Sequence, residues 1–258
     1  MKKWFPKIII GIVFLFLYLP IIVLIVFSFN DTKLNILFEG FTLDWYQKLP
    51  TNTTLLNAFG NTLFVAVTST IISTIIGTIS AIGLHKFDFK GKAFINEILY
   101  IPIVIPEIVL GISLLSIYTL INLSLGIFTL ILAHITFSIP YVIVSVKSTL
   151  QGMNPQLEEA SSDLGASNIY TFFRVILPSI APGILSGAML AFTLSMDDVV
   201  ISYFTTGPES TTLPLYIYSM IKSGIMPDVN ALFSIMIVIT MIGLTIYSLV
   251  SYKKKVRL

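Results

Sequence analysis

Six apolar stretches, each long enough to cross a lipid bilayer, dominate this 258-residue chain. A spanning helix needs about 20 apolar residues. Lipid offers no partner for backbone polar groups, so such a stretch must be helical. With 55% hydrophobic and 11% charged residues, the composition is that of an integral membrane protein. We predict an all-α membrane protein with six transmembrane helices, at Ile8–Phe29, Asn61–Leu84, Ile98–Leu120, Ile127–Val146, Pro182–Phe204 and Ala231–Tyr252.

The sequence contains no low-complexity linker and no convincing internal repeat, so we expect a single transmembrane domain over residues 1–258. The first apolar stretch follows Lys2, Lys3 and Lys7 and could be mistaken for a secretory signal. Its apolar run is longer than the core of a signal peptide, and no small-x-small cleavage pattern follows it before Asn30. A retained membrane anchor is therefore the prediction.

Basic residues predict the orientation of the chain, because cytoplasmic loops are rich in Lys and Arg. A cytoplasmic N-terminus leaves only Lys33, Lys48 and Lys222 outside, and it places twelve basic residues inside: Lys2, Lys3, Lys7, Lys86, Lys90, Lys92, Lys147, Arg174, Lys253, Lys254, Lys255 and Arg257. Both termini are then cytoplasmic. The net charge of +2 follows from this asymmetry and gives no indication of nucleic-acid binding. The absence of cysteine excludes disulfides and thiolate metal sites.

A polar segment between the fourth and fifth apolar stretches has the signals of a helix-turn-helix. Asn154 is a good N-cap, and Pro155 suits the first helical position, where its missing N–H is not needed. Gly165 predicts a left-handed stop. A second short helix is predicted after Ser167, ending at Leu177-Pro178. The pair is too short and too polar to enter lipid, and we expect another protein to bind it.

The spacing in this loop resembles the EAA signature of the permease subunits of bacterial ABC importers. That signature runs Glu-Ala-Ala, three residues, Gly, nine residues, an aliphatic residue, one residue and Leu-Pro. The chain has Glu159-Ala160-Ser161, Gly165, Val175 and Leu177-Pro178. Ser161 replaces the second Ala, and Val175 replaces the usual Ile.

This resemblance implies a type I ABC importer permease fold, in which residues from about 150 to 178 form a cytoplasmic coupling loop. The first helix of the loop is implied to sit in a groove of an ATPase subunit and to carry its closing motion into the membrane. The residues implied in coupling are Glu158, Glu159, Ala160, Ser161 and Gly165. An ordinary amphipathic helix at the membrane interface is the alternative.

Three acidic residues fall within the predicted spans: Glu107 in the third, and Asp197 and Asp198 in the fifth. A carboxylate inside the bilayer is costly and is a functional candidate by default. Glu107 is expected near mid-depth of its span. Neighbouring helix positions lie about 100° apart, so Asp197 and Asp198 are not expected to face one lumen equally.

No Lys or Arg lies inside any predicted span, so the natural complement of these carboxylates is a cation that comes and goes. The hypothesis is a pathway for an organic polycation, with aromatic faces such as Tyr203 or Phe192 adding cation–π attraction. In the alternative reading, the carboxylates are protonated or hydrogen-bonded to helix ends and serve only packing.

Three further segments, Ile101–Gly111, Ser195–Pro208 and Leu213–Leu232, resemble the second permease subunit of spermidine/putrescine importers, and the likeness runs over essentially the whole chain. It implies a bacterial plasma-membrane subunit that pairs with a sister permease, two ATPase subunits and an extracytoplasmic polyamine-binding protein. The Asp197-Asp198 pair favours polyamines over sulfate or molybdate, which it would repel. Ferric iron and thiamine importers share the fold and remain open.

The sequence lacks a phosphate-cradling Gly-Lys-Ser/Thr loop and the His-Glu-x-x-His and Gly-x-Ser-x-Gly motifs. We therefore expect no enzyme activity and no cofactor, with ATP hydrolysis left to partner subunits. The competing class is an ion-coupled secondary transporter, with Glu107 and Asp198 as a proton relay. His134, alone in the fourth stretch, is expected to hydrogen-bond a neighbouring helix. The stripe of Ser69, Ser73, Gly77 and Ser80 predicts close helix packing.

Overall fold

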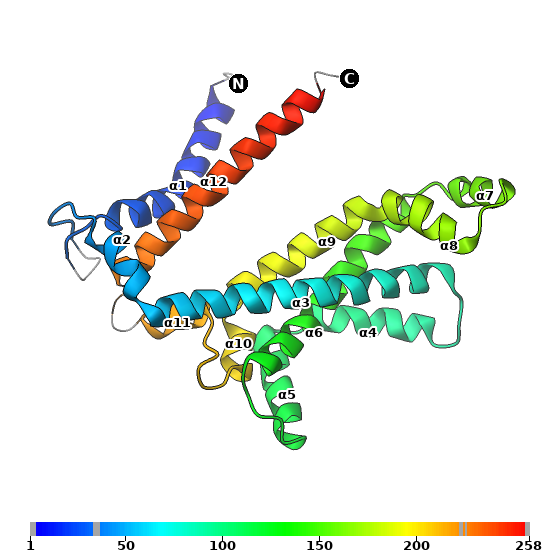
Figure 1. Ribbon diagram of the computed structural model, residues 1–258, viewed down its shortest axis with the longest axis horizontal. Coiled ribbons are helices and arrows are strands. Elements are labelled where there is room, and N and C mark those ends of the chain that lie inside the picture. Colours follow the sequence, from blue (N-terminus) through cyan, green and yellow to red (C-terminus); the bar gives the residue numbers. More distant parts are fainter. Residues whose placement is uncertain (1–3, 33–36, 222–223, 225, 256–258) are drawn as a thin grey trace. The chain divides into compact units, whose positions relative to one another are not determined.

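The structure, a computed structural model, describes residues 4–32, 37–221, 224 and 226–255. Five of the basic residues used to predict orientation, Lys2, Lys3, Lys33, Lys222 and Arg257, lie outside these described residues. Figure 1 shows the helices in chain order: α1 (Phe5–Phe27), α2 (Asp44–Lys48), the 3₁₀ turn η1 (Leu49–Thr51), α3 (Thr53–Lys86), α4 (Lys92–Val104), α5 (Glu107–Leu120), α6 (Ile127–Gln151), α7 (Gln156–Asp163), α8 (Asn168–Thr171), the π turn η2 (Phe172–Ile176), α9 (Leu177–Asp197), α10 (Val200–Thr205), α11 (Leu213–Ser219) and α12 (Pro227–Lys255).

The predicted all-α membrane protein is confirmed. Within the described residues, five helical segments are long and apolar enough to span a bilayer: α1, α3, α6, the run from α8 to α9, and α12. A sixth span is counted if the pair α4 and α5 is taken as one, although the two helices are bent by 109°. The predicted six spans therefore match the structure in number, while two of them differ from the prediction in form.

The third span is broken where the prediction had one continuous helix. Ile105 is extended, with ψ of 146°, and α5 restarts at Glu107. The reason is Pro106, because a proline disfavours the helical conformation in the residue before it and has no N–H to continue the helix. Glu107 thus begins a helix and does not lie in the middle of one.

The fifth span is also broken, at Asp198, and it begins earlier than predicted. Asp198 is extended, with ψ of 126°, between the end of α9 and the start of α10. At the other end, the predicted stop at Leu177-Pro178 is wrong, because the helix continues from Asn168 through η2 into α9 as one 30-residue span. The π turn over Phe172–Ile176 directly precedes Leu177-Pro178, and a local π adjustment of this kind lets a helix continue past a proline, which lacks an N–H.

Contacts divide the chain into two compact units, residues 1–57 with 217–258, and residues 58–216. In the first unit, α12 packs on α1 and α2. The indole N–H of Trp45 donates to the Asn30 carbonyl oxygen at 2.6 Å. The Asn52 side chain caps α3 by accepting from the Leu55 amide at 3.0 Å, and its own amide donates to the Asp228 carboxylate at 2.6 Å.

The second unit is built around α6. Its packing on α9 is close because a Cβ at Gly187 would lie only 3.0 Å from the Val142 Cα atom. On α3, Ser69 and Ser73 are fully buried, and a Cβ at Gly77 would meet the Val142 side chain at 2.7 Å. The predicted packing role is confirmed for Ser69, Ser73 and Gly77, whereas Ser80 is only partly buried. A second apolar cluster joins α5, α6 and α10 through Leu114, Tyr118, Ala133, Phe137 and Ile201.

Candidate functional site

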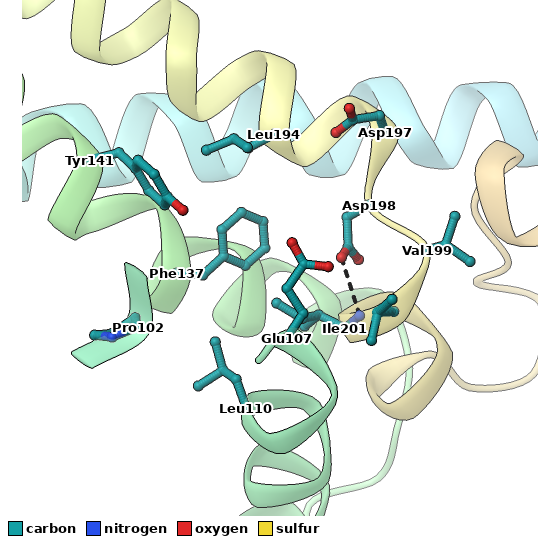
Figure 2. A pocket seen from close by; sticks show the side chains of 11 residues that line it. Pro102, Glu107, Leu110, Phe137, Tyr141, Leu194, Asp197, Asp198, Val199 and Ile201 are labelled. Atoms are coloured by element: carbon teal, nitrogen blue, oxygen red, sulfur yellow. Dashed lines mark hydrogen bonds between the residues drawn. The ribbon is translucent and has the colours of Figure 1, made fainter. Parts of the chain in front are cut away.

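A cavity of about 310 Å³ lies in the second unit, where both helix breaks occur. It is lined by Pro102, Glu107, Leu110, Phe137, Tyr141, Leu194, Asp197, Asp198, Val199, Val200 and Ile201. Figure 2 shows the carboxylates on one side and the rings of Phe137 and Tyr141 on the other. The structure therefore brings together the three acidic residues that the sequence analysis singled out.

The two helix breaks place these carboxylates. Glu107 is the first residue of α5, where an acidic side chain favours the positive end of the helix dipole. Asp197 ends α9, and Asp198 lies in the break that follows. Both aspartates line the same cavity because the chain leaves the helix between them, so the expected 100° separation along a continuous helix does not apply.

The two aspartates nevertheless differ in what they offer a ligand. Asp198 is buried, and its two oxygens accept hydrogen bonds from the backbone amides of Ile201 at 3.1 Å and Ser202 at 2.7 Å. Asp197 and Glu107 are exposed, and neither carboxylate has a hydrogen bond or ion pair with another described residue. Asp197 and Asp198 thus differ, as expected. The cause is that Asp198 caps α10, and not the angle between neighbouring positions of one helix.

The cavity suits a positively charged ligand. Its lining includes the two available carboxylates and has no Lys, Arg or His. A cation that enters finds countercharge at Glu107 and Asp197 and an aromatic ring at Tyr141, whose face attracts cations. Tyr141 also lines a neighbouring, more open groove of about 640 Å³, in which Ser145, Ser148, Thr149 and Ser186 supply hydroxyl groups.

The aromatic residues of the cavity differ from those named in the sequence analysis. Tyr203 lies on α10 with its ring 60% exposed and stacked edge-on against Phe204, and it does not line the cavity. Phe192 lines a separate groove. Sequence reasoning missed Phe137 and Tyr141. Their spacing from His134, three and seven residues along α6, places all three on one helix face and is a signal that was available.

The polar loop folds as the predicted helix-turn-helix at its first end. The Asn154 side chain accepts from the Gln156 amide at 3.0 Å, and α7 begins at Gln156, one residue later than predicted. Gly165 has a φ of +79°, which confirms the left-handed stop. The Ser167 hydroxyl accepts from the Tyr170 amide at 3.3 Å and so caps α8.

The five residues implied in coupling do not share one environment. Glu158 forms an ion pair with Lys86 at the end of α3. Ser161 is buried, and its hydroxyl lies 2.9 Å from that of Thr171, which explains how a serine fits where the EAA signature has alanine. Glu159 and Ala160 are exposed.

Large apolar side chains surround the exposed residues of this loop. Leu164 is 88% exposed, and Leu157, Ile169, Tyr170 and Phe173 are also exposed. Apolar groups gathered on a polar loop mark an interaction surface, for a protein partner or for the membrane interface.

Comparisons with known proteins agree with this architecture. Residues 73–253 match the family described as "Binding-protein-dependent transport system inner membrane component". The spermidine/putrescine transport system permease protein PotC of Escherichia coli strain K12 is 43% identical over 242 residues, which cover 94% of this chain and 92% of that protein. The putrescine transport system permease protein PotI of the same strain is 36% identical over 253 residues, covering 95% and 90%.

A solved structure shares the fold. A chain from a bacterial ABC transporter involved in the import of the acidic polysaccharide alginate superposes with a TM-score of 0.70, covering 94% of both chains at 16% identity. At that identity the likeness concerns the fold alone.

The Lys86–Glu158 ion pair predicts how firmly α7 is held against α3. Because partly exposed pairs contribute about 0.2–1 kcal/mol, Lys86→Glu is expected to speed amide hydrogen exchange in α7 by up to about fivefold. The double variant Lys86→Glu/Glu158→Lys should restore the slower exchange. Lys90→Glu, a reversal at an exposed position in the turn that follows α3, is the control. Equal exchange in all four proteins would show that the pair does not hold the helix.

Proposed function

The chain belongs to the family of binding-protein-dependent transport system inner membrane components, and from this we propose that it is a permease subunit of an ATP-driven importer for the polyamines spermidine and putrescine. The observation that carries the proposal is the cavity, whose lining has no basic side chain and includes two carboxylates, Glu107 and Asp197, with no ion pair to another described residue. The names of the similar E. coli and Haemophilus influenzae permeases support the substrate class.

Polyamines fit the cavity chemically. They carry several ammonium groups separated by methylene chains, and the cavity combines separated carboxylates with apolar and aromatic surface from Leu110, Phe137 and Tyr141. Asp197 and Glu107 contact ammonium groups, and the aromatic rings contact the methylenes. An anionic substrate would meet only repulsion at these two carboxylates.

The chain works with partners that it does not itself contain. A sister permease completes the translocation pathway, two ATPase subunits bind the loops on the cytoplasmic side, and an extracytoplasmic protein delivers the polyamine. Both termini and the α7 loop then face the cytoplasm of a bacterial cell, in keeping with the distribution of basic residues.

Transport follows from the coupling of α7 to the ATPases. ATP binding closes the two ATPase subunits and draws the bound loops together, which opens the paired bundles outward to accept polyamine. Hydrolysis lets the bundles relax inward and releases the ligand to the cytoplasm. In this chain the exposed Glu159 and Ala160, with the apolar groups around them, form the contact with the ATPase.

Uptake measurements test the proposed substrate. Vesicles that contain this chain, the sister permease, the ATPases and the binding protein are expected to take up radiolabelled spermidine and putrescine only when ATP is supplied. Vesicles that contain this chain alone should stay inactive under a proton or sodium gradient. Uptake of thiamine or ferric ion in place of polyamines would overturn the substrate, and gradient-driven uptake by the lone chain would overturn the mechanism.

Replacing Asp197 tests the cavity. Asp197→Asn removes one countercharge while keeping the shape of the side chain. Because a hydrogen bond to a charged group is worth about 1.5–3 kcal/mol, the maximal rate of spermidine uptake should fall by roughly tenfold or more. Glu97→Gln, a matched change at an exposed carboxylate of α4 outside the cavity, should leave the rate unchanged. Equal rates for the two variants would contradict a role for Asp197 in the pathway.

Reversing the charge of Glu159 tests coupling. Glu159→Lys places a cation at the exposed face of α7, near the positive end of its dipole. We expect lost uptake together with weaker retention of the ATPase subunits when the complex is purified through a tag on this chain. Glu209→Lys, a reversal on an exposed loop outside 150–178, is the control. Full retention of the ATPase by the Glu159→Lys protein would count against this contact.

A further inference from the structure

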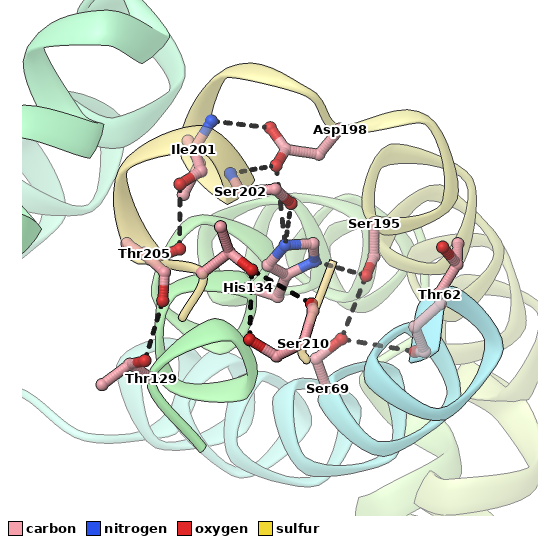
Figure 3. A network of polar contacts seen from close by, with 12 residues as sticks. Thr62, Ser69, Thr129, His134, Ser195, Asp198, Ile201, Ser202, Thr205 and Ser210 are labelled. Atoms are coloured by element: carbon pink, nitrogen blue, oxygen red, sulfur yellow. Dashed lines mark hydrogen bonds and ion pairs between the residues drawn. The ribbon is translucent and has the colours of Figure 1, made fainter. Parts of the chain in front are cut away.

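A network of buried polar side chains lies behind the acidic cavity, centred on His134 of α6 (Figure 3). The His134 ring is fully buried and does not line the cavity. Its Nδ1 atom lies 2.6 Å from the Ser195 hydroxyl on α9, and its Nε2 atom lies 3.2 Å from the Ser202 hydroxyl on α10. One imidazole therefore joins the two helices on either side of the break. The expectation that His134 bonds a neighbouring helix is confirmed.

The same ring stands beside the residue that forms the break. The His134 Nε2 atom is 3.5 Å from the Asp198 carboxylate, whose oxygens accept from the first amides of α10. The far end of α10 is held by α6 as well, because the Thr129 hydroxyl donates to the Thr205 carbonyl oxygen at 2.8 Å. Helix α6 thus fixes the short helix α10 at its start and at its end.

These hydrogen bonds are important because the groups that form them are buried away from water. A buried polar group that loses its partner pays the cost of its desolvation. The Ser195 hydroxyl has a second neighbour, the Ser69 hydroxyl at 3.3 Å, but Ser202 depends on His134 for its side-chain contact. Without the imidazole, the buried Asp198 carboxylate would also lose the ring nitrogen that lies 3.5 Å from it, and Ser195 and Ser202 would lose their shared contact with α6.

We infer that His134 is a positioning residue for substrate: it clamps the α9–α10 break so that Asp198 stays on the amides of α10 while Asp197 is left facing the cavity. The inference rests on the proposed function, since it concerns the site at which the polyamine binds. The two adjacent carboxylates then have different roles. Asp197 contacts the ligand, whereas Asp198 and His134 fix the position of Asp197.

The test uses a thiol as a reporter of where position 197 points. Because the chain has no cysteine, Asp197→Cys adds a single reactive thiol to it. The assembled transporter is treated with a cationic thiosulfonate, and mass spectrometry of this chain gives the rate of modification. The rate is compared with His134 intact and in combination with His134→Leu, His134→Gln or Ser202→Ala. Spermidine uptake is measured with the same His134 and Ser202 changes in chains that retain Asp197.

We expect His134→Leu to slow labelling and uptake, each roughly tenfold, because it removes two buried hydrogen bonds, to Ser195 and Ser202. His134→Gln keeps a donor and an acceptor and should stay near the unmodified values. Ser202→Ala removes one contact without a change in packing volume and should slow labelling to a smaller degree, which keeps the test decisive if His134→Leu does not assemble.

Unchanged labelling in both the His134→Leu and Ser202→Ala proteins would overturn the inference. So would equal slowing by His134→Gln and His134→Leu, because a role in packing alone gives no rescue by a hydrogen-bonding side chain. If wild-type vesicles take up no polyamine, the proposed function fails, but the labelling rates still decide whether His134 positions residue 197.

Discussion

The Asp198 carboxylate accepts two hydrogen bonds from the first amides of α10, and the arrangement of the acidic cavity depends on them. A carboxylate in a membrane-spanning segment needs a partner, and here the backbone itself supplies it. To offer those amides, the chain must stop one helix and begin another. The stop places Asp197 at the end of α9, where its carboxylate has no hydrogen bond or ion pair with another described residue. The hydrogen bonds of Asp198 thus determine where the Asp197 carboxylate lies.

Helix α6 packs against the helices on both sides of the break at Asp198, and against α5 after the break at Pro106. Close backbone approach at Gly187 holds it to α9, and Phe137 packs with Leu114 of α5 and Ile201 of α10. The same helix face that carries Phe137 also carries His134 and Tyr141, so that one face provides the clamp of the break and the aromatic wall of the cavity. Small residues permit close helix packing in a membrane because little other force draws helices together. The positions of the cavity residues on α6 and α9 therefore depend on close packing that the small residues allow.

The sequence allowed the number and helical nature of the spans to be predicted, because apolar length alone dictates them. It did not yield their breaks, because apolar residues continue on both sides of Pro106-Glu107 and of Asp197-Asp198, so that each stretch remains long enough to be one span. Local signals were present, in the proline and in an acid spaced to cap α10, but a capping reading competes with a functional one until packing is known. The loop around Gly165 was predicted from its caps, whereas the stop at Pro178 failed because a π turn accommodates that proline. Each acid could be named from sequence, but their meeting in one cavity, and the presence of Tyr141 there, required the tertiary structure.

The helical run from Asn168 to Asp197, which includes the π turn, links the polar loop to the acidic cavity. Thirty residues rising about 1.5 Å each extend over about 45 Å, from the polar loop at one end to Asp197 in the cavity at the other. This run connects the loop at α8 to Asp197, whereas Asp198 is held to α6 by its contact with His134 and through α10. The single peptide unit between Asp197 and Asp198 therefore joins the helix that reaches the polar loop to the segment that α6 holds in place.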